Sequence, residues 1–230
     1  MRIFTADQGN SNLSILKWEG DAFSLEKNIS RTDIPIIVAN VNKNLSFQNQ
    51  INIKEIKDLN SIMPFEVAYP KTLGVDRLMC ALGAYTLKGD SQNALIIDAG
   101  TFTTIDRLCN NTFKGGMILP GDNILNESYL KGSELFQKNF EYSKNAYPLD
   151  STGDSIQKSV PFLLQATYEK ILQEHFVDHV FLTGGNFSFH EKIISSIITP
   201  GTKVTCDPFL VHKGLHQLYK TKFNVAGSSS

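Results

Sequence analysis

Two short runs of the sequence place an aspartate, one further residue and a glycine directly after an apolar stretch. Asp7-Gln8-Gly9 follows residues 2–6, and Asp98-Ala99-Gly100 follows residues 94–97. A glycine lets the backbone approach a phosphate closely, and the Asn, Ser and Thr residues that follow supply hydrogen-bond donors. An aspartate at a strand end can also hold a hydrated Mg²⁺. The pair of runs predicts a phosphate-binding cleft between two related halves of the chain.

Each run also fits an ordinary hairpin turn, because Asp, Gly and Asn are common turn residues. A strand followed twice by Asp-[Ser/Thr]-Gly would instead indicate an aspartic protease, in which two carboxylates share one proton. Gln8 and Ala99 stand where that pattern has a hydroxyl residue. The helix-rich second half of the chain also fits the protease fold poorly, so the protease is disfavoured.

A third candidate is Gly74-Val75-Asp76-Arg77, at the start of a predicted helix over residues 75–88. Asp76 could accept a proton from a substrate hydroxyl, and Arg77 could bind an anionic group or orient Asp76. In isolation the same residues fit a helix start with an acidic residue in the first turn. Glycine turns at residues 115–121 and 183–186 each join a strand to a helix and could be binding loops or tight connections.

Composition excludes several other classes of protein. The 22 basic and 23 acidic side chains nearly cancel, which argues against a non-specific nucleic-acid binder. Three widely spaced cysteines form neither a disulfide framework nor a CxxC pair. No stretch is long and apolar enough to cross a membrane, and Asp7 interrupts any signal peptide. We therefore expect a cytoplasmic protein with reduced thiols and neither a nucleic-acid nor a membrane partner.

Several well-known binding motifs are absent from the sequence. The sequence has neither the GxxxxGK[ST] loop nor the GxGxxG fingerprint. The pairs His175/His179 and His212/His216 are each four residues apart but lack the HExxH form. These histidines are therefore more consistent with surface or partly buried positions than with zinc binding.

The elements that must position these residues follow from the apolar spacing. Strands are predicted at 2–6, 13–16, 23–25, 35–39, 65–68, 94–97, 103–108, 113–119 and 180–182, and helices at 75–88, 124–136, 156–175, 187–198 and 210–219. The strand–turn–strand pattern occurs twice, which indicates two similar halves that divide near Gly89-Asp90. Residues 227–230, Gly-Ser-Ser-Ser, are interpreted as a cloning remnant.

The order of the motifs resembles that of type III pantothenate kinases from the first residues to about Asn186. The matching segments are Asp7-x-Gly-Asn-Ser, Gly-Val-Asp76-Arg, Asp98-x-Gly-Thr-x-Thr-Thr-x-Asp106, Gly-Gly-Met-Ile-x-Pro-Gly, Ser151-Thr152 and Thr183-Gly-Gly. The resemblance implies an actin-like α/β fold with two ribonuclease-H-like domains, at 1–89 and 90–226, each a mixed sheet flanked by helices. It also implies a homodimer that uses ATP to convert pantothenate to 4′-phosphopantothenate, the first step of coenzyme A synthesis.

The resemblance also implies roles for individual residues. Asp76 would be the proton acceptor, and Asp98 would bind a monovalent cation, K⁺ or NH₄⁺, in addition to the Mg²⁺ that accompanies ATP. The implied ATP-binding residues are Asp7, Gln8, Gly9, Asn10, Ser11, Asn12, Leu13, Ser14 and Thr101. The implied pantothenate contacts are Tyr69, Gly74, Val75, Asp76, Arg77 and Thr152, with Thr152 supplied by the partner subunit.

A second hypothesis is a non-catalytic relative that acts as an accessory factor for transcriptional activation. A relative that has lost catalysis would be expected to lose Asp7, Asp76 or Asp98. All three are present, so the sequence favours the enzyme.

Overall fold

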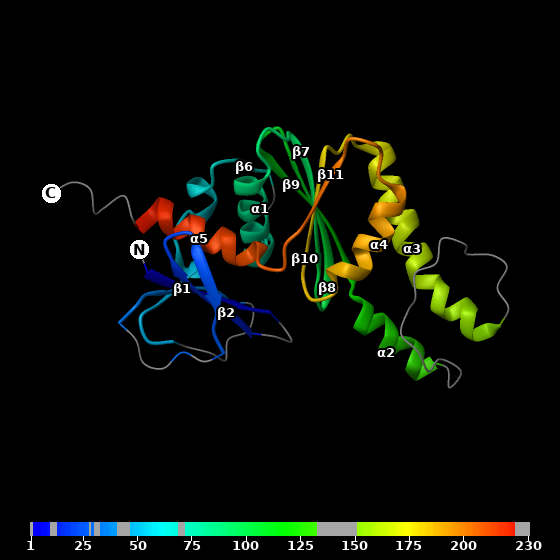
Figure 1. The fold of residues 1–230 in the computed structure, drawn as a ribbon, viewed down its shortest axis with the longest axis horizontal. Coiled ribbons are helices and arrows are strands. Elements are labelled where there is room, and N and C mark those ends of the chain that lie inside the picture. The colour runs from blue at the N-terminus through cyan, green and yellow to red at the C-terminus, as the bar shows by residue number, and fades with distance from the viewer. Residues whose placement is uncertain are drawn as a thin grey trace. The chain divides into compact units, whose positions relative to one another are not determined.

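The computed structural model describes residues 2–9, 13–27, 29, 33–40, 47–68, 72–132 and 151–223. These residues form two compact units. The first takes the described parts of Met1–Gln92, Asp106–Gly115 and Phe209–Ser230, and the second those of Asn93–Ile105 and Gly116–Pro208. Figure 1 labels the helices and most of the strands. The chain first passes from one unit to the other between Gln92 and Asn93. The domain limits 1–89 and 90–226 stay a prediction.

The first unit contains a five-stranded mixed sheet in the order β3-β2-β1-β4-β5. Its strands are β1 (Arg2–Gln8), β2 (Leu13–Glu19), β3 (Ala22–Leu25), β4 (Ile36–Asn40) and β5 (Gln50–Asn52). β1 is antiparallel to β2 and parallel to β4. Alternate residues Phe4, Ala6, Ile36 and Val38 share one apolar cluster, as the period-2 geometry of strands requires.

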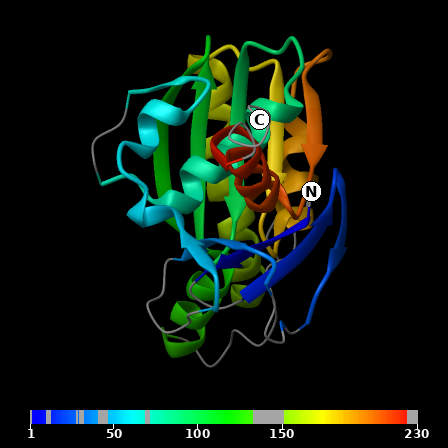
Figure 2. The ribbon, with the colours of Figure 1, turned by 90° about the vertical axis from the view of Figure 1, so that its left-hand side faces the viewer.

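Two helices of the first unit, α1 (Val75–Leu87) and α5 (Leu210–Phe223), pack closely through a pair of glycines. A Cβ atom on Gly83 would collide with the Leu210 carbonyl oxygen, and one on Gly214 would collide with the Met79 carbonyl oxygen. In Figure 2 the red α5 lies against the blue-green α1. Bare backbone at both positions therefore sets the distance between the helices.

The short elements η1 (Ile53–Glu55), η2 (Leu59–Ile62) and β6 (Glu66–Val67) complete the first unit. β6 runs parallel to the first residues of β9, with Glu66 opposite Thr112 and Val67 opposite Phe113. An open pocket of about 630 Å³ is lined by residues of η2, β6 and the segment between them, together with Asn111.

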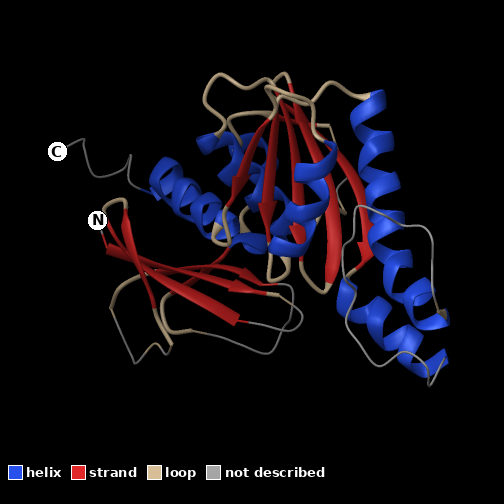
Figure 3. Cartoon of the chain, turned by 45° about the vertical axis from the view of Figure 1, so that its right-hand side comes forward, coloured by secondary structure: helices blue, strands red, loops and turns tan. Residues whose placement is uncertain are grey.

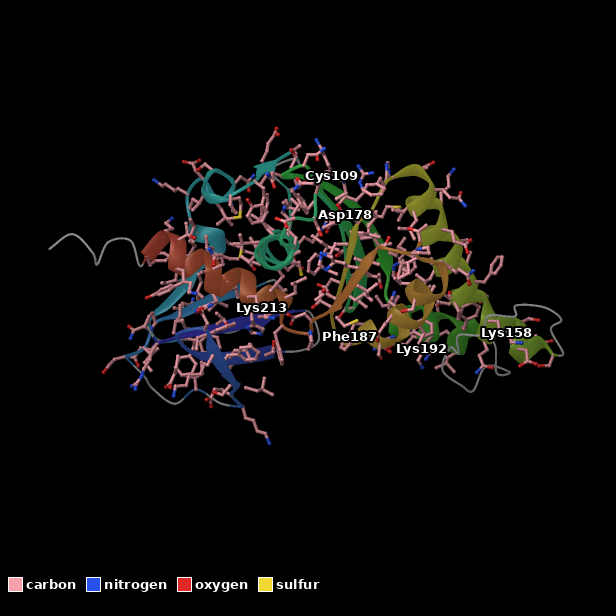
Figure 4. The ribbon with its side chains drawn as sticks, turned by 45° about the horizontal axis from the view of Figure 1, so that its top comes forward. Cys109, Lys158, Asp178, Phe187, Lys192 and Lys213 are labelled. Carbon is pink, nitrogen blue, oxygen red and sulfur yellow. The ribbon has the colours of Figure 1, made fainter. Side chains whose placement is uncertain are left out.

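In the second unit the strands lie in the order β11-β10-β7-β8-β9. They are β7 (Asn93–Ala99), β8 (Phe102–Cys109), β9 (Thr112–Pro120), β10 (His179–Thr183) and β11 (Lys203–Cys206), and β8 and β9 pass from one unit to the other. β10 runs parallel to both β7 and β11. Asp178, labelled in Figure 4, accepts the Asn93 N–H at 3.2 and 3.3 Å and so joins the starts of β7 and β10.

Three helices accompany this sheet: α2 (Asp122–Gly132), α3 (Thr152–Glu174) and α4 (Phe187–Ile197). Figure 3 shows the long α3 beside the strands. Ser151 caps α3, because its Oγ accepts the Asp154 N–H at 3.1 Å. The core of the unit joins β7 and β10 to α3 and α4 through buried residues that include Leu95, Val180, Tyr168 and Ile193.

The predicted helices and strands are confirmed with small shifts of their ends, apart from the last residues of the predicted helix 124–136, which lie outside the described residues. β5 and β11 were not predicted. Both are short and only partly buried, so their strand geometry depends on pairing with β4 and β10. Within the described residues, no helix has the length and hydropathy needed to cross a membrane.

The contact between α1 and α5 predicts a cost for adding one methyl group. Gly214→Ala should lower the free energy of unfolding by about 1–3 kcal/mol, because a backbone oxygen cannot move aside as a flexible side chain can. The gain in helix propensity, about 1 kcal/mol, should not offset this loss. Urea unfolding monitored by circular dichroism measures the change.

Gly153→Ala is the matched control, since it also lies in a helix. A Cβ at Gly153 would meet only the Ser151 Oγ, at 3.6 Å, so this variant should be as stable as the wild type or slightly more stable. Equal stability of Gly214→Ala and the wild type would contradict the packing argument.

Candidate functional site

The first predicted phosphate loop lies where β1 passes into β2. Asp7 and Gln8 end β1, while Leu13 and Ser14 begin β2, and the antiparallel register places Asp7 opposite Ser14. Gly9 follows β1, whereas Asn10, Ser11 and Asn12 lie outside the described residues. Gln8 is buried, and its Oε1 has no hydrogen-bond partner among the described residues. Polar side chains therefore stand at both ends of the loop.

The start of α1 holds the predicted proton acceptor, Asp76. Gly74 is the N-cap residue, and the Asp76 Oδ1 accepts the Arg77 backbone N–H at 2.9 Å. A Cβ atom on Gly74 would collide with that same carboxylate oxygen, so the glycine makes room for it. The positive end of the helix dipole favours the ionised carboxylate at this place. Asp76 remains partly exposed, as a group that must reach a substrate requires.

Arg77 forms a buried ion pair with Asp106. Its Nε donates to the Asp106 Oδ2 at 2.9 Å and its Nη2 donates to the Asp106 Oδ1, while the two side chains are only 6% and 3% exposed. Burial raises the pKa of the Asp106 carboxyl, and the two bonds from Arg77 oppose that rise. The pair links the start of α1 to β8. The sequence alone gives no partner for Asp106, although a carboxylate next to the apolar Ile105 in a predicted strand was a signal for one.

In the second unit, three chain segments meet around the Asp98-Ala99-Gly100-Thr101 turn. Asp98 lies opposite Thr183, the last residue of β10. The Gly121 N–H donates to the Thr101 carbonyl oxygen, and the Asn186 N–H donates to the Ala99 carbonyl oxygen, both at 3.0 Å. The prediction of a turn over residues 115–121 is wrong for most of that segment, because β9 continues to Pro120 and only Gly121 connects it to α2. Gly121 and the turn at 183–186 are both hydrogen-bonded to the aspartate turn.

Glycine is required at the two close approaches to this turn. A Cβ on Gly121 would lie 2.8 Å from the Thr101 carbonyl carbon. A Cβ on Gly184 would lie 2.6 Å from the Ala99 carbonyl carbon, and the Gly184 φ of +87° is one that other residues rarely adopt. From the sequence alone, both glycine segments fit either a ligand-binding loop or a simple connection between elements. In the structure they build the surroundings of Asp98.

A cluster of side chains that the sequence reasoning missed joins the same two turns. The Asn186 Nδ2 donates to the Asp122 Oδ2, and the His190 Nε2 lies 3.5 Å from that oxygen. The Tyr168 hydroxyl lies 2.5 Å from the His190 Nδ1. Burial raises the pKa of Tyr168, so its hydroxyl stays protonated. The sequence signal for this cluster was that Tyr168 and His190 occupy positions on the apolar faces of their predicted helices.

The remaining predicted residues are placed as follows. Thr101 is partly buried beside Gly100, and Thr152 is exposed as the first residue of α3. Tyr69 lies outside the described residues. No group of three or more His, Cys, Asp or Glu residues that could hold a metal ion occurs in the described ranges. His212, from one of the histidine pairs, uses its two ring nitrogens for Thr5 and Ser14.

The fold is that of the actin-like ATPases and sugar kinases, with mixed sheets flanked by helices. Among solved structures, a Campylobacter jejuni protein described as a Baf family transcriptional activator matches with a TM-score of 0.67 and 24% identity, over 96% of this chain and 100% of its own. The activator of 2-hydroxyisocaproyl-CoA dehydratase from Clostridium difficile, with bound ADPNP, matches with a TM-score of 0.56 and 11% identity, over 100% and 99%.

The particular family follows from the sequence. The family model for type III pantothenate kinase matches residues 34–174. The type III pantothenate kinase of Flavobacterium johnsoniae is 29% identical over 96% of this chain and 99% of its own length. That of Aquifex aeolicus is 29% identical over 95% and 97%. The chain belongs to the type III pantothenate kinase family.

The buried pair predicts that removing one partner costs more than removing both. Asp106→Ala should lower the free energy of unfolding by about 3–5 kcal/mol, because it leaves the Arg77 guanidinium buried without its carboxylate. The double variant Arg77→Met/Asp106→Ala should recover much of that loss. Urea unfolding at neutral pH compares the three proteins.

The exposed pair between Lys170 and Glu174, at 2.9 Å, provides the control. Glu174→Ala should leave the unfolding midpoint unchanged, since water screens an exposed pair. If the single and double variants of the buried pair were equally stable, Arg77 would not depend on Asp106.

Proposed function

We propose that this protein transfers the γ-phosphoryl group of ATP to pantothenate and so makes 4′-phosphopantothenate, the first step of coenzyme A synthesis. Family membership supports the reaction. The observation that carries the assignment to this chain is Asp76, a partly exposed carboxylate that Gly74 and the helix start hold in one position. ATP and pantothenate are the proposed substrates, and the cytoplasm, where ATP is made and used, is the proposed location.

Asp76 is the proposed proton acceptor. Its Oδ1 is occupied by the Arg77 N–H, whereas no hydrogen bond to its Oδ2 is formed within the described residues. The Oδ2 atom can therefore accept the proton of the pantothenate hydroxyl while the hydroxyl oxygen attacks the γ-phosphorus. The bond from the γ-phosphorus to the bridging oxygen breaks, and ADP leaves. Phosphoryl transfer needs mainly positioning and charge stabilisation, so a held carboxylate suits this role. Gly74, Val75, Arg77 and Tyr69 would line the pantothenate site.

The proposed ATP contacts come from both aspartate turns. Residues 7–14 would surround phosphates with backbone amides and short polar side chains, and Thr101 would add a further contact. Mg²⁺, which supplies charge neutralisation when ATP binds, would be held near Asp7. The donor set fits a hydrated ion, because carboxylate, amide and hydroxyl oxygens are the ligands that Mg²⁺ prefers.

A monovalent cation is proposed at Asp98 because the loops lack basic residues. ATP brings about four negative charges to the site, and these must be neutralised. Residues 7–14 and 98–106 contain no Lys or Arg but do contain three carboxylates, at Asp7, Asp98 and Asp106. Arg77 already bonds to Asp106 with two of its nitrogens. Bound K⁺ or NH₄⁺ would therefore provide charge that the side chains of these loops do not.

A homodimer is also proposed, with Thr152 of one subunit reaching the pantothenate of the other. The exposed position of Thr152 at the first turn of α3 is compatible with that contact. Sedimentation velocity at the protein concentration of the assay tests the assembly. A fully active monomer would contradict it.

The non-catalytic alternative is favoured by one observation, the similarity to the Campylobacter jejuni protein described as a transcriptional activator. At 24% identity that likeness concerns the fold alone. Asp7, Asp76 and Asp98 are all retained in this chain, which favours the kinase. A protein that binds ATP yet phosphorylates neither pantothenate nor any tested sugar or acetate would revive the alternative.

Asp76→Asn should lower kcat for pantothenate by about 10²- to 10⁴-fold, the usual contribution of a general base. The ATP dissociation constant should stay unchanged, because the amide has the same shape and only the proton acceptor is lost. A coupled ADP-release assay and calorimetry measure the two quantities. Asp90→Asn, at an exposed aspartate beyond the end of α1, is the matched control and should keep wild-type turnover. Near-normal kcat in Asp76→Asn would remove Asp76 from the mechanism.

K⁺ or NH₄⁺ should activate the enzyme strongly and Na⁺ only weakly, since the smaller ion suits a site of fixed oxygens less well. Asp98→Asn should weaken that activation and raise the KM for ATP. ATP titrations at constant ionic strength, with each chloride salt in turn, provide the test. Equal rates in Na⁺ and K⁺ would exclude the cation role of Asp98.

A further inference from the structure

His212 connects two strands that lead into and out of the first phosphate loop. It projects from α5, is 1% exposed, and lies with its Nδ1 2.7 Å from the Thr5 Oγ1 of β1 and its Nε2 2.8 Å from the Ser14 Oγ of β2. All three residues belong to the first unit. The distances are those of well-formed hydrogen bonds.

The direction of these hydrogen bonds follows from Trp18, whose indole nitrogen can only donate. The Trp18 Nε1 donates to the Thr5 Oγ1 at 2.9 Å. Within the described residues, the remaining side-chain contact of the Thr5 hydroxyl is the His212 Nδ1, so we assign the Thr5 hydroxyl as the donor to that nitrogen. The Nδ1 atom accepts, and the Nε2 atom of the neutral ring therefore carries the hydrogen and donates to Ser14. Burial lowers the pKa of His212 to about 4, which agrees with a neutral ring, and the Thr5 backbone near the ring opposes only part of that shift.

Ser14 is left with a hydroxyl hydrogen that it can donate elsewhere. Its oxygen accepts from His212, and its backbone lies opposite Asp7 at the end of the loop. A hydroxyl whose oxygen already accepts a hydrogen bond is polarised and becomes a better donor. Phosphate oxygens are strong acceptors for such a donor.

We propose that His212 is a positioning residue for ATP, which directs the Ser14 hydroxyl hydrogen toward a phosphate oxygen of the bound nucleotide. The proposal rests on the proposed ATP-binding role of residues 7–14. It adds His212, which is distant in sequence, to the residues that prepare this loop for ATP. His212 acts through Ser14 and does not itself touch ATP. Thr5 and Trp18 act one step further back, because they set which ring nitrogen carries the hydrogen.

Two amide variants separate positioning from packing. The amide of glutamine reaches the place of Nε2, so His212→Gln keeps the donor to Ser14 and loses the bond to Thr5. The shorter asparagine reaches the place of Nδ1, so His212→Asn keeps the bond to Thr5 and loses the one to Ser14. A residue that only fills the core would be affected similarly by both.

Calorimetric titration with a non-hydrolysable ATP analogue and Mg²⁺ gives the dissociation constants. His212→Gln should bind within about threefold of the wild type, whereas His212→Asn and Ser14→Ala should each bind roughly tenfold more weakly, the value of one hydrogen bond to a charged group. The double variant His212→Asn/Ser14→Ala should be no weaker than Ser14→Ala alone. The KM for pantothenate should not change in any of them.

His216→Phe is the matched control from the next turn of α5. The His216 ring stacks on Trp18 with centroids 4.0 Å apart and an angle of 11° between the planes, and the phenyl ring can keep that contact. This variant should retain wild-type affinity for the analogue. Thermal unfolding of every variant shows that the proteins compared are folded.

Equal weakening in His212→Gln and His212→Asn, or no weakening in His212→Asn, would overturn the proposal. The binding measurement needs no phosphoryl transfer, so the two failures can be told apart. A wild type that binds the analogue but leaves pantothenate unphosphorylated contradicts the proposed reaction and not the role of His212. A wild type that does not bind the analogue overturns both.

Discussion

The buried pair of Arg77 and Asp106 is the interaction on which the first unit's candidate site depends most. A guanidinium and a carboxylate that lose water must compensate each other through close, paired hydrogen bonds, and these two do so. Because Arg77 lies directly after Asp76, the pair also fixes the start of α1 relative to β8. The position of the proposed proton acceptor therefore depends on an ion pair between two other side chains.

In the second unit, glycines without side chains position the segments around Asp98. Gly121 and Gly184 allow two turns to touch the carbonyl groups of residues 99–101, and backbone hydrogen bonds at 3.0 Å hold them there. A side chain at either glycine would push one turn away from Asp98. Gly83 and Gly214 use the same principle between α1 and α5. Close approach of backbones is thus a repeated means of placing the functional segments of this chain.

The charges of the candidate site explain why the proposed function requires cations. Its loops carry aspartates where other nucleotide-binding proteins use lysine, and the nearest arginine in sequence to Asp76 already bonds to Asp106. Neutral donors such as backbone amides, Thr101 and Ser14 can orient phosphates but cannot cancel their charge. A buried neutral histidine is compatible with this distribution of charge. The His212 ring can orient the Ser14 hydroxyl group without placing a charge in the core.

The sequence by itself determined the elements and the local motifs, because apolar spacing and turn residues act over a few neighbouring positions. It placed Asp7, Asp76 and Asp98 at strand or helix ends, and the structure has them there. Only the tertiary structure decided that Arg77 bonds to Asp106, that Asp122 joins Asn186 and His190, and that His212 reaches Thr5 and Ser14. These partners are separated by 29 residues in the first case and by 198 or more in the last. No local pattern encodes such contacts, because they form only when distant elements pack and their buried polar atoms must find partners.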